Sequence, residues 1–380
     1  VFYNQDLYHA VQEAGANSPD LAGEDLRLLQ EFLNTFERNG IHLPEADRLA
    51  AEKAQQRIDL LKTRFQANVA DFNQPIRFSE AELQGLPPSA LNNLDLDENG
   101  PYLMDPRLAS HLTVVMTFAE NPATRRKAFM AYHSVAAEKN PEILEEIIQL
   151  RAEKARMMGY ESHAEFVLSG RMAKTVNTVI DFQQNLADRL ADKFDQEMET
   201  LRHLKAVDLN DPGVKLAPWD LDYYQRVYNE TLFALDEEAM KKYFSMDNCL
   251  QGMFEIFEEV FGLKIFARSP TPEKLWHPDV ELYQVNDAAT GEPLGLFYLD
   301  LYPREGKFTH FATSFTYMGN TYADGRCERP TAVLYGNWPE PGHDIPSLLS
   351  FSELETLFHE FGHVLHIILM EPQYSTLRST

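Results

Sequence analysis

Apolar residues recur at intervals of three and four along the first two-thirds of the chain, a period that predicts long amphipathic helices. One such stripe runs from Ala51 to Phe72. In a second helix, Asn140-Pro141 suits the start and Gly159 suits the end. A third helix carries a stripe that we expect to be core and not a cofactor-binding surface: Val179, Phe182, Leu186, Leu190, Phe194, Met198, Leu201 and Leu204.

From about Lys264 the pattern changes to one typical of strands. Short apolar or β-branched runs lie between clusters of Gly, Pro and Asn. These runs are Leu263–Phe266, Val280–Val285, Leu294–Leu301 and Thr331–Tyr335, with a hairpin loop expected at Asn286–Gly291. They predict a small antiparallel sheet. Thr331–Asn337 is the candidate edge strand, where an extended peptide could pair by its backbone; an ordinary interior strand is an equal alternative.

The segment after these strands predicts a largely buried helix. Ser352 and Glu355 have the spacing of a capping box, in which the two side chains accept from free N–H groups of the first turn. The apolar positions that would bury the helix are Leu354, Leu357, Phe358, Phe361, Leu365, Ile368 and Leu369.

This helix carries the motif His359-Glu360-x-x-His363. Two His four residues apart on a helix project from one face and can reach one Zn²⁺, and the Glu between them is placed to take a proton from a metal-bound water. The alternative is a solvated Glu on a core helix with two satisfied His. His366 lies two turns from His359, too far to share the metal, and is expected to support the ligands or to pack.

The nine residues Phe358–His366 resemble the active-site signature of the thimet oligopeptidase family of zinc metallopeptidases. That family includes neurolysin, oligopeptidase A, dipeptidyl carboxypeptidase and mitochondrial intermediate peptidase. Further matching runs spread the resemblance over nearly the whole chain: Arg151–Met172, Pro218-Trp219-Asp220 with Tyr223-Tyr224, Trp276–Val280 and Gly295–Lys307.

The resemblance implies a mainly α, zincin-like helical metallopeptidase with a small antiparallel sheet beside the active-site helix. Residues 1–262 would form the helical walls of a deep channel, and residues 263–380 the catalytic region. The family's third zinc ligand is a Glu on a following helix, but the chain ends at Thr380, only seventeen residues after His363. The chain is therefore expected to be a fragment that lacks both ends of its parent.

For the parent, the resemblance implies a zinc-dependent oligopeptidase that hydrolyses short unstructured peptides. Zn²⁺ would be bound by His359, His363 and the Glu beyond Thr380, and Glu360 would act as the general base. We expect a monomeric parent in the cytoplasm or, alternatively, the mitochondrial matrix. The other reading is a catalytically inactive peptide-binding or structural fragment of the same scaffold, and the activity of the 380 residues alone stays open.

Composition narrows the classes further. A formal charge of −25 argues against nucleic acid as a partner, because phosphates would be repelled. The excess acid could attract cationic peptides or simply solvate the surface. No apolar run approaches the eighteen or so residues of a membrane span. Cys249 and Cys327 provide no metal spacing and no disulfide framework, which favours a reducing compartment.

Overall fold

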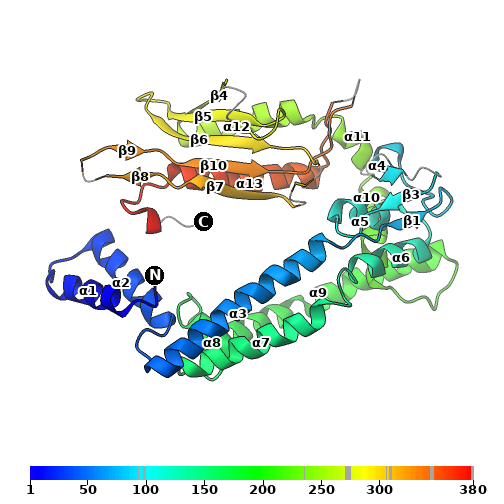
Figure 1. The fold of residues 1–380 in the computed structure, drawn as a ribbon. Helices are drawn as coiled ribbons and strands as arrows, with labels where there is room; N and C mark the ends of the chain where they lie inside the picture. Colours follow the sequence, from blue (N-terminus) through cyan, green and yellow to red (C-terminus); the bar gives the residue numbers. More distant parts are fainter. Residues whose placement is uncertain are drawn as a thin grey trace. The chain divides into compact units, whose positions relative to one another are not determined.

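The computed structural model describes residues 1–91, 94–96, 100–234, 236–269, 275–304, 306–307, 310–322, 324–342 and 346–377, and it divides into two compact units (Figure 1). The first unit comprises Val1–Pro19 and Gln30–Leu235, and the second comprises Asp20–Leu29 and Asp236–Thr380. In the described ranges, every helix is too short or too polar to cross a bilayer.

The first unit is built almost entirely of helices, as its apolar periodicity predicts. Its helices are α1 (Gln5–Ala16), α3 (Glu45–Ala70), α4 (Pro88–Leu91), α5 (Ala109–Phe118), α6 (Pro122–Tyr132), α7 (Asn140–Met157), α8 (His163–Leu168), α9 (Val176–Asp208), the 3-10 turn η1 (Pro218–Asp220) and α10 (Leu221–Phe233), while α2 (Gly23–Arg38) contributes to both units. Three short antiparallel strands join in the order β1 (Ile76–Phe78), β3 (Tyr102–Met104), β2 (Asp95–Leu96).

Helices α3 and α7 confirm two of the predicted helices and lie side by side in Figure 1. Ile58 and Leu61 of α3 pack against Ile147 of α7 in a common buried cluster. Asn140 is the first residue of α7 and does not cap it, because its Oδ1 accepts from Asn68 Nδ2 of α3 at 2.8 Å, while its Nδ2 donates to the Phe65 carbonyl of α3 at 3.2 Å. The expected N-cap residue therefore fastens one helix to the other.

Helix α9 also forms where the third stripe predicts it, but the stripe is core only near its C-terminal end. Leu201 is buried against Tyr223 and Tyr224 of α10. Phe182 and Phe194 are 68% and 57% exposed. The expectation that the whole stripe is core was therefore wrong, because a helical period identifies an apolar face without identifying what covers it.

The second unit combines a sheet with helices. Its elements are α11 (Glu237–Lys241), α12 (Met246–Phe261), β4 (Leu263–Arg268), β5 (Glu281–Asp287), β6 (Pro293–Asp300), β7 (Ala312–Tyr317), β8 (Asn320–Thr321), β9 (Cys327–Glu328), β10 (Thr331–Tyr335), α13 (Phe351–Leu369) and the 3-10 turn η3 (Ser375–Leu377). The four predicted strands are confirmed as β4, β5, β6 and β10, and the mainly α fold class is confirmed as well.

The main sheet has five strands in the order β4-β5-β6-β10-β7. Strands β4, β5 and β6 form an antiparallel meander, β10 runs parallel to β6, and β7 runs antiparallel to β10. The sheet is therefore mixed, whereas a small antiparallel sheet was expected. The candidate edge, Thr331–Asn337, contains β10, which is an interior strand. It pairs with β6 on one side and with β7, a strand that was not predicted, on the other.

Helices α12 and α13 pack on the same face of this sheet. Phe361 of α13 contacts the ring of Phe254 in α12 at 5.5 Å and the ring of Phe297 in β6 at 5.4 Å between centroids. Figure 1 shows α13 running along β10 and β7. Trp338 is fully buried and its Nε1 donates to the Glu353 carbonyl at 3.1 Å. This packing holds the motif helix against β10 and β7.

Candidate active site

Helix α13 begins two residues earlier than predicted. The capping box is formed by Ser350 and Glu353, in place of Ser352 and Glu355. The Ser350 hydroxyl accepts from the Glu353 N–H at 3.2 Å, and the Glu353 carboxylate accepts from the Ser350 N–H at 2.7 Å. The sequence contains two overlapping Ser-x-x-Glu patterns, and spacing alone did not distinguish them.

The two motif histidines lie together on the exposed side of α13. Their Nε2 atoms are 3.3 Å apart, and their ring planes meet at 84°. His366 is exposed as well, one turn beyond His363, so it is not a packed core residue. The exposure places both imidazole rings of the motif where a ligand can reach them from solvent.

Glu360 lies on the buried side of α13, unlike the two histidines, and is only 8% exposed. Its backbone and side chain both face strand β7. The Thr313 hydroxyl is 2.9 Å from the Glu360 carbonyl oxygen and 2.9 Å from Oε2 of the carboxylate. A buried carboxylate requires donors because desolvation disfavours its charge, and Thr313 supplies one.

Sequence reasoning did not identify Thr313. It lies 47 residues before Glu360, in a strand that was not predicted. Thr313 pairs with Leu334 of β10, and Leu334 belongs to the buried cluster that includes Phe361. Cross-strand neighbours share a face of the sheet, so the pairing directs the Thr313 side chain toward α13.

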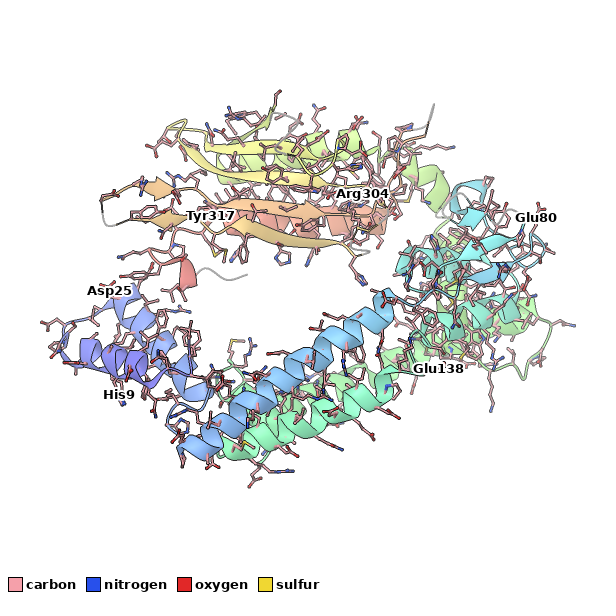
Figure 2. The ribbon with its side chains drawn as sticks, in the orientation of Figure 1. His9, Asp25, Glu80, Glu138, Arg304 and Tyr317 are labelled. Carbon is pink, nitrogen blue, oxygen red and sulfur yellow. The ribbon has the colours of Figure 1, made fainter. Side chains whose placement is uncertain are left out.

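A buried ionic cluster lies at the end of β6, in the turn region that leads toward β7. Asp300 is 2% exposed and accepts from Arg304 at 2.6 and 2.8 Å, and from Trp276 Nε1 at 2.8 Å. Lys307 donates to the Asp300 carbonyl at 2.8 Å. Arg304 and Tyr317, which are labelled in Figure 2, lie toward the two ends of β7.

This cluster shifts the pKa of the Asp300 carboxyl. Burial raises the pKa, but the hydrogen bonds from Arg304, Lys307 and Trp276 outweigh burial and hold it well below its ordinary value of 3.8. Burial also lowers the pKa of the Lys307 ammonium. We interpret these charges as structural, since they fasten the chain between β6 and β7 and so fix the position of the strand beside Glu360.

The motif presents two imidazole nitrogens on the exposed side of α13 and one carboxylate that is hydrogen-bonded to Thr313. Nowhere in the described ranges do three or more His, Cys, Asp or Glu side chains form a group that could hold a metal. A zinc centre generally takes at least three protein ligands. A metal at His359 and His363 would therefore need a further ligand from outside the described part of the chain.

Comparison with known proteins defines the class. Residues 115–380 match Peptidase family M3, and this range includes the whole main sheet and α13. The chain belongs to this peptidase family, which confirms the resemblance to the thimet oligopeptidases.

Individual relatives agree. The chain is 30% identical over 391 residues to a thimet-like oligopeptidase of Dictyostelium discoideum, covering 99% of this chain and 58% of that protein. It is 31% identical over 384 residues to oligopeptidase A of Salmonella typhimurium, covering 96% and 55%. It is 29% identical over 370 residues to saccharolysin of Saccharomyces cerevisiae, covering 93% and 52%. The chain thus spans about half the length of these relatives.

Proposed function

We propose that these residues carry the metal-binding and general-base elements of a zinc-dependent oligopeptidase that hydrolyses short, unstructured peptides. The observation that supports this most directly is the 3.3 Å separation of the His359 and His363 Nε2 atoms. Two nitrogens that each lie about 2.0–2.1 Å from a tetrahedral zinc are roughly 3.3–3.4 Å apart. The pair therefore fits Zn²⁺, with a third ligand expected from a Glu beyond Thr380.

Zn²⁺ at this position would polarise the scissile carbonyl and lower the pKa of a bound water. Glu360 would take the proton of the attacking water and pass it to the nitrogen of the leaving amine. Its burial and its hydrogen bond from Thr313 hold the carboxylate on the side of α13 that faces β7. His359 and His363 would hold the metal and take no part in the proton transfer.

Strand β7 is our candidate for the surface that binds the substrate backbone. It is the last strand in the order of the main sheet, and Thr313 places it directly beside Glu360. An extended peptide that pairs with this edge would be held independently of its side chains. Phe315, which is substantially exposed, pairs with Ala332 and so shares a face of the sheet with Thr313, where it would contact the peptide.

The wider organisation is part of the same proposal. Residues 1–262 would supply helical walls that admit short peptides and exclude folded proteins. Residues 263–380 would supply the catalytic region. We propose a monomeric enzyme of the cytoplasm or the mitochondrial matrix. One relative is named as a mitochondrial intermediate peptidase, which gives the second location its support.

The proposal is tested by cleavage of a short internally quenched peptide. We expect the protein, prepared at the full length of its relatives, to cleave it, to lose activity in a zinc chelator, and to regain it when Zn²⁺ is added. The 380-residue chain is assayed for cleavage of the same peptide as a second sample. Peptide binding without cleavage by the longer protein would favour an inactive peptide-binding scaffold instead.

A further inference from the structure

The contact between Thr313 and Glu360 links the candidate substrate strand to the candidate general base. The single hydrogen of the Thr313 hydroxyl has two acceptors at 2.9 Å, one on the backbone and one on the side chain of Glu360. Both acceptors belong to the same residue, so the hydroxyl fixes the Glu360 side chain relative to its own helix turn. No such constraint follows from the His-Glu-x-x-His spacing.

Pairing of β7 with β10 fixes the position of Thr313. Its strand neighbour Leu334 is fully buried, in the cluster that also contains Leu357 and Val364 of α13. Threonine is β-branched, which restricts its χ1 angle and suits a strand. The hydroxyl therefore reaches Glu360 from a backbone that is anchored through β10 to the motif helix.

We propose that Thr313 is a positioning residue: it holds Oε2 of Glu360 and so leaves Oε1 as the oxygen that exchanges the proton during peptide hydrolysis. This inference rests on the proposed function. A glutamate side chain has three rotatable bonds, and confining it through one oxygen removes conformations in which neither oxygen faces the reacting water. Thr313 would act through Glu360 and would not touch the reacting atoms with its side chain.

The test compares Thr313→Val, which keeps the shape and removes the hydroxyl, with Thr313→Ser, which keeps the hydroxyl. In the protein at the length of its relatives, Thr313→Val should lower kcat about tenfold with KM within twofold of the unsubstituted protein. Thr313→Ser should retain most of kcat. A crystal structure of Thr313→Val should show the Glu360 carboxylate in a different or a mixed conformation.

Thr356→Val is the matched control. The Thr356 hydroxyl also donates to a carbonyl at the start of α13, but this carbonyl is that of Ser352, at 2.9 Å, and not that of a motif residue. It should leave kcat, KM and the Glu360 conformation unchanged. The positioning role is overturned if Thr313→Val keeps the kcat of the unsubstituted protein, if Thr313→Ser is as impaired as Thr313→Val, or if only KM changes.

Failure of the proposed function has a different signature. If the unsubstituted protein cleaves no peptide, the peptidase proposal is refuted, and the crystal structure still decides the Thr313 contact. A Glu360 carboxylate that keeps one unchanged conformation in Thr313→Val would show that the hydroxyl positions nothing. A carboxylate that moves in Thr313→Val but not in Thr313→Ser would support the contact without activity.

Discussion

The Nε2 atoms of His359 and His363 lie 3.3 Å apart on the exposed face of α13. Two neutral imidazole rings at this distance can share one hydrogen bond, with one ring donating and the other accepting. The same distance suits two ligands of one zinc ion, as argued above. The geometry alone is compatible with both, so the distinction depends on whether metal is retained.

We therefore expect either His359→Ala or His363→Ala to abolish stable zinc binding, since each removes one of the nitrogen ligands. The measurement is metal content by mass spectrometry after dialysis against a mild chelator, on the protein at the length of its relatives. His366→Ala, on the same exposed face, is the control and should keep its zinc. Equal zinc content in all three variants would mean that the metal is held elsewhere.

Glu360→Gln should leave the zinc bound and lower kcat by about 10²–10⁴. The amide preserves the shape of the side chain, but it cannot accept a proton from water at neutral pH. Metal analysis and peptide cleavage on the same sample separate this result from that of the histidine variants. Full activity of Glu360→Gln would refute the general-base assignment.

The motif helix could be predicted from the sequence because all of its information is local. His359, Glu360 and His363 lie within two turns, so helical geometry places the imidazole rings on one face without knowledge of the rest of the chain. The exact start of the helix could not be predicted, because Ser350 and Ser352 both begin a Ser-x-x-Glu pattern. The first turn of the observed helix also accepts a hydrogen bond from Trp338 at the Glu353 carbonyl, a long-range contact that local spacing does not contain.

Strand β7 and its contact with Glu360 could not be predicted, because both depend on long-range pairing. The strand is six residues long, and four of them are exposed, so it lacks a strong apolar pattern. Because β7 was not predicted, the sequence could not decide whether β10 is an edge strand or an interior strand. The same limit applies to α9, where periodicity located the apolar stripe but not its exposure at Phe182 and Phe194.

If β7 binds the substrate backbone, methylation of backbone nitrogens in the peptide should inhibit its cleavage. A methylated nitrogen cannot donate to a strand edge, whereas the side chains of the peptide are unchanged. We expect kcat/KM to fall about tenfold for each methyl group at a pairing position, by the loss of about one hydrogen bond. Methylation at alternate nitrogens, which point away from the edge, is the control. An equal effect at every position would argue against strand pairing.

The Asp300 cluster should make the stability of the second unit sensitive to acid. The folded-state pKa of Asp300 is lower than its ordinary value of 3.8, because the donors from Arg304, Lys307 and Trp276 outweigh the effect of burial. The stabilisation is therefore complete above about pH 4 and is lost as the pH falls from there toward the folded-state pKa.

Asp300→Asn should lower the free energy of unfolding by about 3–5 kcal/mol at pH 7, since it leaves the buried Lys307 and the partly buried Arg304 without their counter-charge. The difference from the unsubstituted chain should shrink below pH 4, as measured by thermal unfolding in metal-free buffer. Glu259→Gln, at an exposed position of α12, is the control and should unfold close to the unsubstituted chain. A difference that stays constant down to pH 2 would contradict the ionic origin of the effect.

Gly336 should be the position in the second unit that is least tolerant of a side chain. A Cβ atom there would lie 1.7 Å from Cζ3 and 1.9 Å from Cε3 of Trp338. The indole ring is fully buried, bonded to the Glu353 carbonyl and packed on Phe311 at 4.6 Å between centroids, so it cannot move aside. Gly336→Ala should lower the free energy of unfolding by about 3 kcal/mol or more.

Gly252→Ala provides the matched comparison, because Gly252 lies inside α12 and an added Cβ would meet nothing within 4 Å. It should raise the free energy of unfolding by up to about 1 kcal/mol, since Ala favours the helix over Gly. Denaturant unfolding of the 380-residue chain measures both.

Gly336→Ala should also weaken zinc binding, because Trp338 holds the first turn of α13 and displacing its ring would shift the motif helix. If Gly336→Ala unfolds with the same free energy as Gly252→Ala, the backbone at Gly336 can move away from the Trp338 ring, and the predicted clash is refuted.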